Sequence, residues 1–573
     1  MSSIDVEKMP LTPIRRHRFS LRRIIILILS LLVMHRIILL LFDTKPPAKQ
    51  HIEFQADKGY GEMYKLSWQS LSQALNSAKP KIATVGDFKQ SPGISIESIE
   101  STTTAVDVLN VSPSVISSMQ TSHANFAKTL KDGNKLSVIY QSGQQGIVVT
   151  ATLHELPQLL ISLRLLRRTR SSLPVEIFLL TQDDYDAKLC REIFPKLDAH
   201  CSILEEHLDS SPLPIMPQSR NERRIQAQEP LNKLLAIFFS RFEDILLLDP
   251  STLVYNNPDI MLKEEPFLST GLLIWPDFWA STVSPKLFQI QNAPQVKRVR
   301  RDNIRTVDFG QMVISKSIHS ATLLLSIYYT YFGPNLYESL QQQSSAGERG
   351  SQAIKCAARY LETPYYMMKR EVEAVGFPDL DSDNKGFYGV AMLQSFASDD
   401  FHRLPKDRQR PLFIRQNNPT LHPAYIMDRN IAVFKKQSNL KQEEDAKMEV
   451  KEIDSDSNKG MQKVKAAAAA APGGEITKKD QSNPFEIPSV APSDLDLGLH
   501  HRMWEWFGGR WMSNGWRDPD PERALWEEVA TVACVDYTHF RVWPSRDGKD
   551  TAQNCARINY HRGQLGWKEF FVL

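Results

Sequence analysis

The chain has 573 residues, 24% of them charged, and its 69 basic and 66 acidic residues leave a net charge of +3. This length exceeds what one compact core usually holds, so we expect one large domain or two, with additional tails. The balanced charge, with basic residues clustered at the N-terminus, argues against a nucleic acid as the main partner.

The first predicted element is a membrane anchor at residues 24–42. This run of nineteen positions is apolar except for Ser30, His35 and Arg36, and at about 1.5 Å per residue it just crosses a bilayer core of roughly 30 Å. Arginines upstream predict a cytoplasmic basic tail at 1–23 and a lumenal remainder. No small-residue cleavage site follows, so we expect a retained signal anchor. Because an arginine such as Arg36 is costly in a bilayer, an interfacial or cleaved segment is the alternative to a membrane-spanning anchor.

Residues 43–140 are polar and rich in serine and threonine, with a helical pattern only around 64–75. Such a segment is typical of a lumenal stem that holds a catalytic domain away from the membrane. It contains a glycosylation sequon at Asn110, which has meaning only if this part of the chain is lumenal.

From residue 146 the pattern becomes that of an α/β domain, which we assign to 141–430. Predicted strands alternate with predicted helices, in the order 146–151, 154–170, 175–180, 231–242 and 245–248. This alternation predicts a mostly parallel sheet with helices on both faces.

Asp249 directly follows the last of these strands. A carboxylate in this position lies at the carboxyl edge of the sheet, where α/β proteins bind ligands. Taken alone, however, Asp249 with the following Pro250 and Ser251 is better explained as a turn or as a helix N-cap. The local sequence leaves both interpretations open.

Two segments close the chain. Residues 436–490 are charged and of low complexity, which predicts a disordered insertion. Residues 498–573 contain seven of the ten tryptophans; these side chains can stack on sugar rings, but at this density we favour core packing. Of the five cysteines, none in a CxxC pair, Cys534 and Cys555 are the favoured disulfide, with buried free thiols as the alternative.

Ordered sequence blocks between 143 and 428 resemble one protein family. The blocks are residues 146–151, 233–237, 246–249, 257–259, 270–279, 308–316, 347–349 and 412–423. In this order they resemble the fungal Golgi α-mannosyltransferases of glycosyltransferase family 71, which use GDP-mannose to extend mannan and N-glycan outer chains.

The resemblance implies a fold and a reaction. The fold is GT-A, a Rossmann-like nucleotide-binding half fused to an acceptor-binding half. The reaction moves mannose from GDP-mannose to a mannosylated glycan acceptor with retention of configuration. The enzyme is a type II Golgi membrane protein, in some cases in a complex with other mannosyltransferases. Mn²⁺ or Mg²⁺ is held by an Asp-x-Asp motif.

The resemblance also implies site residues. Three residues would act on the sugar and the acceptor: Asp277, Asp308 and Gln311. The alternatives are that Asp277 caps a turn, that Asp308 starts a loop and that Gln311 binds a backbone group. Asp249 would hold the metal. The donor would contact Thr150, Lys233, Asp249, Ser251, Arg349 and Arg415. For Lys233, a solvated helix face is an equal alternative.

Two departures from the family make the metal doubtful. The second acidic position of the motif is Ser251, and Arg415 stands where the family has a histidine. Asp249 could hold a weak metal ion, or Arg349, Arg415 and Lys316 could replace it, because arginine binds phosphate bidentately. Catalysis could also be lost. The alternatives to an enzyme are a non-catalytic partner in a Golgi mannosyltransferase complex and a membrane-anchored glycan-binding protein.

Overall fold

The structure is a computed structural model. It describes residues 58–86, 91, 107–132, 136–208, 229–293, 305–344, 347–348, 350–378, 387–417, 420–427, 503–504, 506–507, 520–543 and 548–567. All of them belong to a single unit that begins at Lys58. The predicted anchor at 24–42 and the predicted insertion at 436–490 lie outside these ranges. Within them, no helix is both long enough and apolar enough to cross a membrane.

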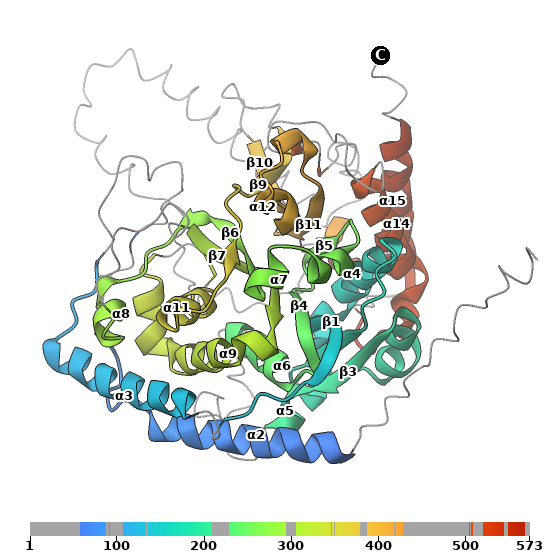
Figure 1. Ribbon diagram of the computed structural model, residues 1–573. Helices are drawn as coiled ribbons and strands as arrows, with labels where there is room; N and C mark the ends of the chain where they lie inside the picture. The colour runs from blue at the N-terminus through green and yellow to red at the C-terminus, as the bar shows by residue number, and fades with distance from the viewer. Residues whose placement is uncertain are drawn as a thin grey trace, which may run out of the picture. The chain divides into compact units, whose positions relative to one another are not determined.

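A seven-stranded sheet lies at the centre of the unit (Figure 1). Its strands, in spatial order, are β3 (Ala199–Ile203), β2 (Val175–Leu179), β1 (Gln141–Ala151), β4 (Phe242–Leu248), β7 (Arg305–Ser315), β6 (Leu272–Ala280) and β8 (Tyr366–Met367). Strands β1 to β4 are parallel, whereas β7 runs antiparallel to both of its neighbours, β4 and β6. The predicted α/β class is confirmed, with an antiparallel section that the sequence did not indicate.

Helices cover both faces of this sheet, as its apolar strands require. Leu246 and Leu248 of β4 belong to an apolar cluster with α4 and α14, whereas Ile245 and Leu247 belong to a second cluster with α6 and α9. The helices are α2 (Lys58–Ser77), α3 (Pro113–Lys131), α4 (Leu156–Arg168), α5 (Leu204–His207), α6 (Glu229–Phe239), α7 (Phe267–Thr270), α8 (Pro285–Ile290), α9 (Lys316–Tyr331), α10 (Glu338–Gln341), α11 (Ala353–Tyr360), α12 (Ala397–Phe401), α14 (Pro521–Cys534) and α15 (Gly548–Trp567).

A second, antiparallel sheet begins where β4 ends. Its strands, in spatial order, are β12 (Trp506–Phe507), β9 (Glu373–Pro378), β10 (Phe387–Ser395), β11 (Pro411–Gln416) and β5 (Thr252–Val254). Only residues 249–251 separate β4 from β5, so the two sheets meet at this short link. Strand β11 pairs with β5 so that Arg415 lies opposite Thr252. This pairing brings β11 close to Asp249.

The described part of the predicted stem packs against the sheet domain. Trp68 and Leu71 of α2 and Phe126 of α3 are buried, at 2%, 0% and 0% exposure, and they share an apolar cluster with Leu235 of α6. Polar composition concealed this contact, because the two helices bury only a few large apolar side chains each. Within the predicted stem of 43–140, helices α2 and α3 therefore pack against the sheet domain.

The C-terminal helices also pack against the sheet domain. Arg164 of α4 contacts Asp536, which follows α14, at 2.6 Å. Trp504 and Trp526 are buried, at 1% and 0% exposure, so the core interpretation holds for these two side chains.

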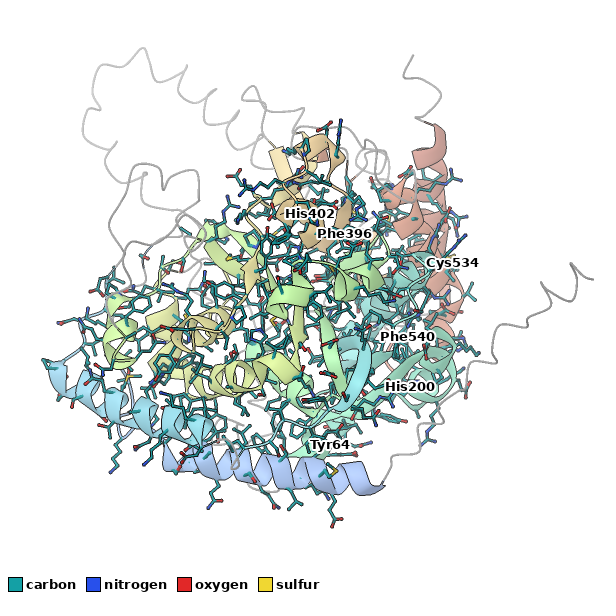
Figure 2. All side chains as sticks on the ribbon, viewed as in Figure 1. Tyr64, His200, Phe396, His402, Cys534 and Phe540 are labelled. Atoms are coloured by element: carbon teal, nitrogen blue, oxygen red, sulfur yellow. A yellow bond between two sulfur atoms is a disulfide. The ribbon has the colours of Figure 1, made fainter. Side chains whose placement is uncertain are left out.

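The disulfides agree in part with the sequence analysis. Cys534, at the end of α14 (Figure 2), bonds to Cys555 of α15, as predicted. A second bond, between Cys190 and Cys201, was not predicted. Cys356 is a free, buried thiol.

Glu522 of α14 should be important for stability. Its side chain is 0% exposed and accepts hydrogen bonds from the backbone N–H groups of Met503 and Trp504, at 2.7 and 3.2 Å. We expect Glu522→Ala to lower the free energy of unfolding by about 2–3 kcal/mol, because it leaves buried donors without their charged acceptor. Urea denaturation would measure this. Glu527→Ala, in an exposed ion pair with Arg168, should cost less than about 1 kcal/mol; equal losses would contradict the prediction.

Candidate functional site

Asp249 is the first residue after β4, at the carboxyl edge of the parallel strands. Its backbone N–H donates to the carbonyl oxygen of Gly310, at 2.8 Å. Its Oδ1 accepts hydrogen bonds from the backbone N–H and the hydroxyl of Ser251, at 2.8 and 2.6 Å. Its Oδ2 accepts from Lys233 Nζ, at 2.9 Å. The turn that the sequence suggested therefore exists, and the same carboxylate also binds a buried cation.

The surroundings of Asp249 keep it ionised. Burial by itself would raise the pKa of Asp249, but Lys233, Arg415 and the two hydrogen bonds from Ser251 hold that pKa well below its usual range. Asp249 is therefore a fixed negative charge at physiological pH.

Lys233 lies on α6 and is 1% exposed, so the solvated-face alternative is wrong. Besides Asp249, its ammonium group contacts Glu229 Oε1 at 2.5 Å and Glu348 Oε1 at 3.5 Å. Burial would lower the pKa of Lys233, but Asp249, Glu348 and Glu229 together raise it above its usual value, against a smaller opposing effect of Arg415. Lys233 is therefore a permanent buried cation.

Arg415 and Asp308 form a second charged pair at this edge. The guanidinium of Arg415, on β11, donates to Oδ1 of Asp308, on β7. Oδ2 of Asp308 accepts from Gln311 Nε2 at 2.7 Å. Gly310 makes the approach possible, because a methyl group on Gly310 would lie only 2.6 Å from Cδ of Arg415. Asp308 lies within a strand, so the loop-start alternative is wrong.

Glu348 connects the two pairs. Its Oε1 lies 3.5 Å from Lys233 Nζ, and its Oε2 lies 3.5 Å from Arg415 Nη2. Both oxygens are buried and accept no hydrogen bond within the part of the chain that the structure describes. Among the described residues, this carboxylate is therefore held by its attraction to the two cations.

Asp277 is a carboxyl group of the site whose charge can change near neutral pH. It lies within β6, so the turn-cap alternative is wrong. Its Oδ1 accepts from the backbone N–H of Phe278, at 2.6 Å. Burial, followed by repulsion from Asp308 and Glu348, raises the pKa of Asp277 to about 7, against opposing effects of the Phe278 hydrogen bond and of Arg415. Such a group can both hold and release a proton at physiological pH.

The remaining predicted residues differ in position. Thr150 is buried near the end of β1, next to the residue that pairs with Leu248, so it lies close to Asp249. Arg349 lies outside the described residues. Lys316 was wrongly considered for this site: its ammonium donates to the carbonyl oxygens of Ile139 and Ser240. The cause is the antiparallel direction of β7, which takes its last residues to the amino end of β4.

Sequence reasoning missed Glu229 and Glu348. Glu229 had a recognisable signal, because it precedes Lys233 by four residues on a helix, a spacing at which opposite charges meet. Glu348 had no local signal, since its partners Lys233 and Arg415 come from distant parts of the chain.

The described residues do not fit a divalent metal at Asp249. They include no group of three histidine, cysteine, aspartate or glutamate side chains suited to a metal ion. Both carboxylate oxygens of Asp249 already accept hydrogen bonds, and Ser251 acts as a donor rather than as a ligand. The ammonium group of Lys233 lies 2.9 Å from Oδ2 of Asp249, the position beside the carboxylate that a metal cation would take.

Comparison with known proteins adds a relationship. The sequence profile of the mannosyltransferase family Mannosyl_trans3 matches residues 144–306 and 295–395. The chain is 28% identical over 318 residues to alpha-1,2-mannosyltransferase MNN24 of Candida albicans, covering 49% of this chain and 43% of that protein. It is 28% identical over 326 residues to alpha-1,2-mannosyltransferase MNN2 of Saccharomyces cerevisiae, covering 52% of each. The chain thus spans about half the length of these relatives.

Likeness to solved structures is weaker. The galactosyltransferase LgtC, crystallised with donor and acceptor sugar analogues, is 10% identical and covers 39% of this chain and 72% of its own, with a TM-score of 0.24. The glycosyltransferase GlyE of Streptococcus pneumoniae is 11% identical and covers 39% of this chain and 45% of its own, with a TM-score of 0.23. TM-scores this low do not support any conclusion about the residues of the site.

Proposed function

We propose that this chain, a distant homologue of fungal alpha-1,2-mannosyltransferases, is a GT-A type glycosyltransferase that moves mannose from GDP-mannose to a mannoside with retention. One observation carries the proposal. Asp249 and Lys233, both within the matched segment, are bound to each other at the carboxyl edge of the sheet, and Arg415 reaches the same edge from the second sheet. Buried cations at this edge suit a ligand with phosphate groups.

The residues of the site divide into two roles in this proposal. Lys233, Arg415 and Thr150 would face the donor nucleotide, and Arg349 and Ser251 would complete that side. Asp277 would face the reacting sugar. As a carboxylate it can accept the proton of the acceptor hydroxyl or stabilise positive charge that develops at the anomeric carbon.

Gln311 and Asp308 would position the sugar. Gln311 is 0% exposed, and its Nε2 donates to Asp308. Its Oε1 is buried and has no hydrogen-bond partner among the described residues. A sugar hydroxyl could donate to this oxygen, which would remove the cost of leaving it unsatisfied.

The location in this proposal is the Golgi lumen, with residues 24–42 as a type II anchor. Two disulfides, Cys190–Cys201 and Cys534–Cys555, support an oxidising compartment. The exposed Asn110 of the sequon, just before α3, agrees with it. The other partners would be the mannosylated acceptor and further mannosyltransferases in a complex.

A second candidate function is that of a non-catalytic partner in such a complex. The observation in its favour is Ser251, which supplies no carboxylate and satisfies Oδ1 of Asp249 itself. The glycan-binding alternative loses support, because Trp504 and Trp526 are buried and do not offer their faces to a sugar.

Mannose transfer by the purified full-length protein in detergent tests the proposal. The protein would be incubated with GDP-mannose and an α-mannoside, with and without Mn²⁺, and the products separated by mass. We expect a mannoside longer by one residue. A folded protein that makes no product in either condition would support the second candidate.

Transfer should depend on pH through Asp277, whose pKa is raised to about 7 by burial and by Asp308 and Glu348, against Arg415. A raised carboxyl pKa means that the group is protonated below about 7, so we expect the rate to fall about tenfold per pH unit below that value and to level off above it. Burial also raises the pKa of Glu229 to about 7, against Lys233, so titration of Glu229 would give an inflection at the same pH. Because we assign the inflection to Asp277, Glu229→Gln should retain it. A flat profile in the parent would contradict the assignment.

A further inference from the structure

We propose that Lys233 and Arg415 form one anion site that takes the donor's diphosphate without a divalent cation, and that Glu348 occupies this site until the donor binds. The identity of the donor rests on the proposed function. The anion site itself rests on the charges and distances of the described residues.

The geometry shows that the two cations can share one anion. Lys233 comes from α6 and Arg415 from β11, yet each lies 3.5 Å from a different oxygen of the Glu348 carboxylate. The two oxygens of a carboxylate and two oxygens of one phosphoryl group have similar separations, so a phosphoryl group could take the place of the Glu348 carboxylate. An arginine guanidinium binds such oxygens through two N–H groups, and a lysine ammonium contributes a point charge beside them.

Glu348 is a replaceable occupant of this site. A separation of 3.5 Å is an ion pair but is too long for a strong hydrogen bond. Both of its oxygens are buried and accept no hydrogen bond from the described residues, which is an unfavourable state for a carboxylate. A phosphate oxygen at hydrogen-bond distance from Arg415 would satisfy that donor better. Lys233, whose ammonium group already contacts Asp249, Glu229 and the carbonyl oxygen of Phe309, would add positive charge. The departing Glu348 would also remove its own negative charge from the site.

The remaining contacts explain why a metal is not needed. Both oxygens of Asp249 already accept hydrogen bonds, Oδ1 from Ser251 and Oδ2 from Lys233. Lys233 therefore stands between the carboxylate and the incoming phosphate, the place that a divalent ion would take in an Asp-x-Asp site. Arg415, anchored on Asp308, supplies the second positive charge.

Calorimetric titration of the full-length protein in detergent with GDP and with inorganic pyrophosphate tests this site. In excess EDTA we expect the affinity for GDP to stay within about threefold of that in Mn²⁺. Arg415→Gln should weaken pyrophosphate binding by about tenfold or more, the loss of one charge-assisted contact. Glu348→Gln should strengthen it several-fold. Matched charge changes away from the site, Arg168→Gln and Glu371→Gln, should leave it unchanged; the partners of these two residues are Glu527 and Arg305.

Several results would overturn the inference. These are GDP binding that disappears in EDTA and returns with Mn²⁺, and Glu348→Gln weakening pyrophosphate binding. Should Arg415→Gln fail to fold by circular dichroism, Arg415→Lys keeps the charge, and it should bind pyrophosphate more weakly than the parent while still resisting EDTA; loss of its binding in EDTA alone would overturn the inference. Mannose transfer that strictly requires Mn²⁺ refutes this inference and leaves the proposed function intact. Metal-free GDP binding without any mannose transfer supports this inference and contradicts the proposed function.

Discussion

Replacing Asp277 with asparagine should lower the rate of mannose transfer by about a hundredfold to ten-thousandfold, the usual contribution of a positioned acid–base group. Asparagine keeps the size of the side chain and can still accept from Phe278 N–H, which lies 2.6 Å from Asp277 Oδ1. It cannot take up a proton or carry negative charge. The affinity for GDP should change by less than about threefold, because the substitution keeps the size of the side chain and Asp277 is assigned to the reacting sugar, whereas Lys233 and Arg415 are assigned to the diphosphate.

The measurement is kcat and KM for GDP-mannose and for the acceptor, in the parent and the variant. Asp244→Asn is the matched control. Asp244 is also a partly buried carboxylate, which accepts from Gln145 Nε2 at 3.1 Å, but it lies opposite Ser315 at the far end of β4. It should keep most of the activity. An Asp277→Asn enzyme as fast as this control would remove Asp277 from the reaction.

Replacing Lys233 with methionine should lower the free energy of unfolding by about 3–5 kcal/mol, the cost of breaking a buried ion pair by removing one partner. Methionine fills much of the same space, so packing changes little. The charge loss leaves Asp249 and Glu348 facing each other across a buried site without their shared cation. Urea denaturation followed by circular dichroism would measure the loss.

Two further variants sharpen this result. Lys406→Met removes a lysine that is half exposed and 3.8 Å from Glu373, and it should cost less than about 1 kcal/mol. The double variant Lys233→Met with Glu348→Gln should recover part of the loss, because it also removes one uncompensated negative charge. A Lys233→Met protein as stable as the Lys406→Met protein would show that the buried ion pairs do not stabilise this fold.

Much of the fold could be predicted because it is encoded locally. The apolar run at 245–248 predicts a strand buried on both faces, and the structure has β4 at Phe242–Leu248. The helical spacing in 154–170 corresponds to α4 at Leu156–Arg168. Each of these patterns depends on neighbours within a few residues, so a single sequence contains it in full.

The composition of the site was only partly predictable. Asp249 and Lys233 are sixteen residues apart, on adjacent elements, and a family resemblance identified both. Arg415 was predicted only as an aligned residue, and its contact with Asp308 depends on the pairing of β11 with β5. Lys316 was misplaced because a matched sequence block does not show the direction in which its strand runs, and β7 is antiparallel to β4.

The sequence alone determined the α/β class, the strand that ends at Asp249, the tryptophan-rich tail and the relationship to mannosyltransferases. Only the tertiary structure decided which charges meet. Lys233, Arg415 and Glu348 come together because an antiparallel strand and a second sheet return to the carboxyl edge of β4. The two ion pairs of Glu348 join residues 115 and 67 positions apart, and no local pattern of polarity or periodicity contains that information.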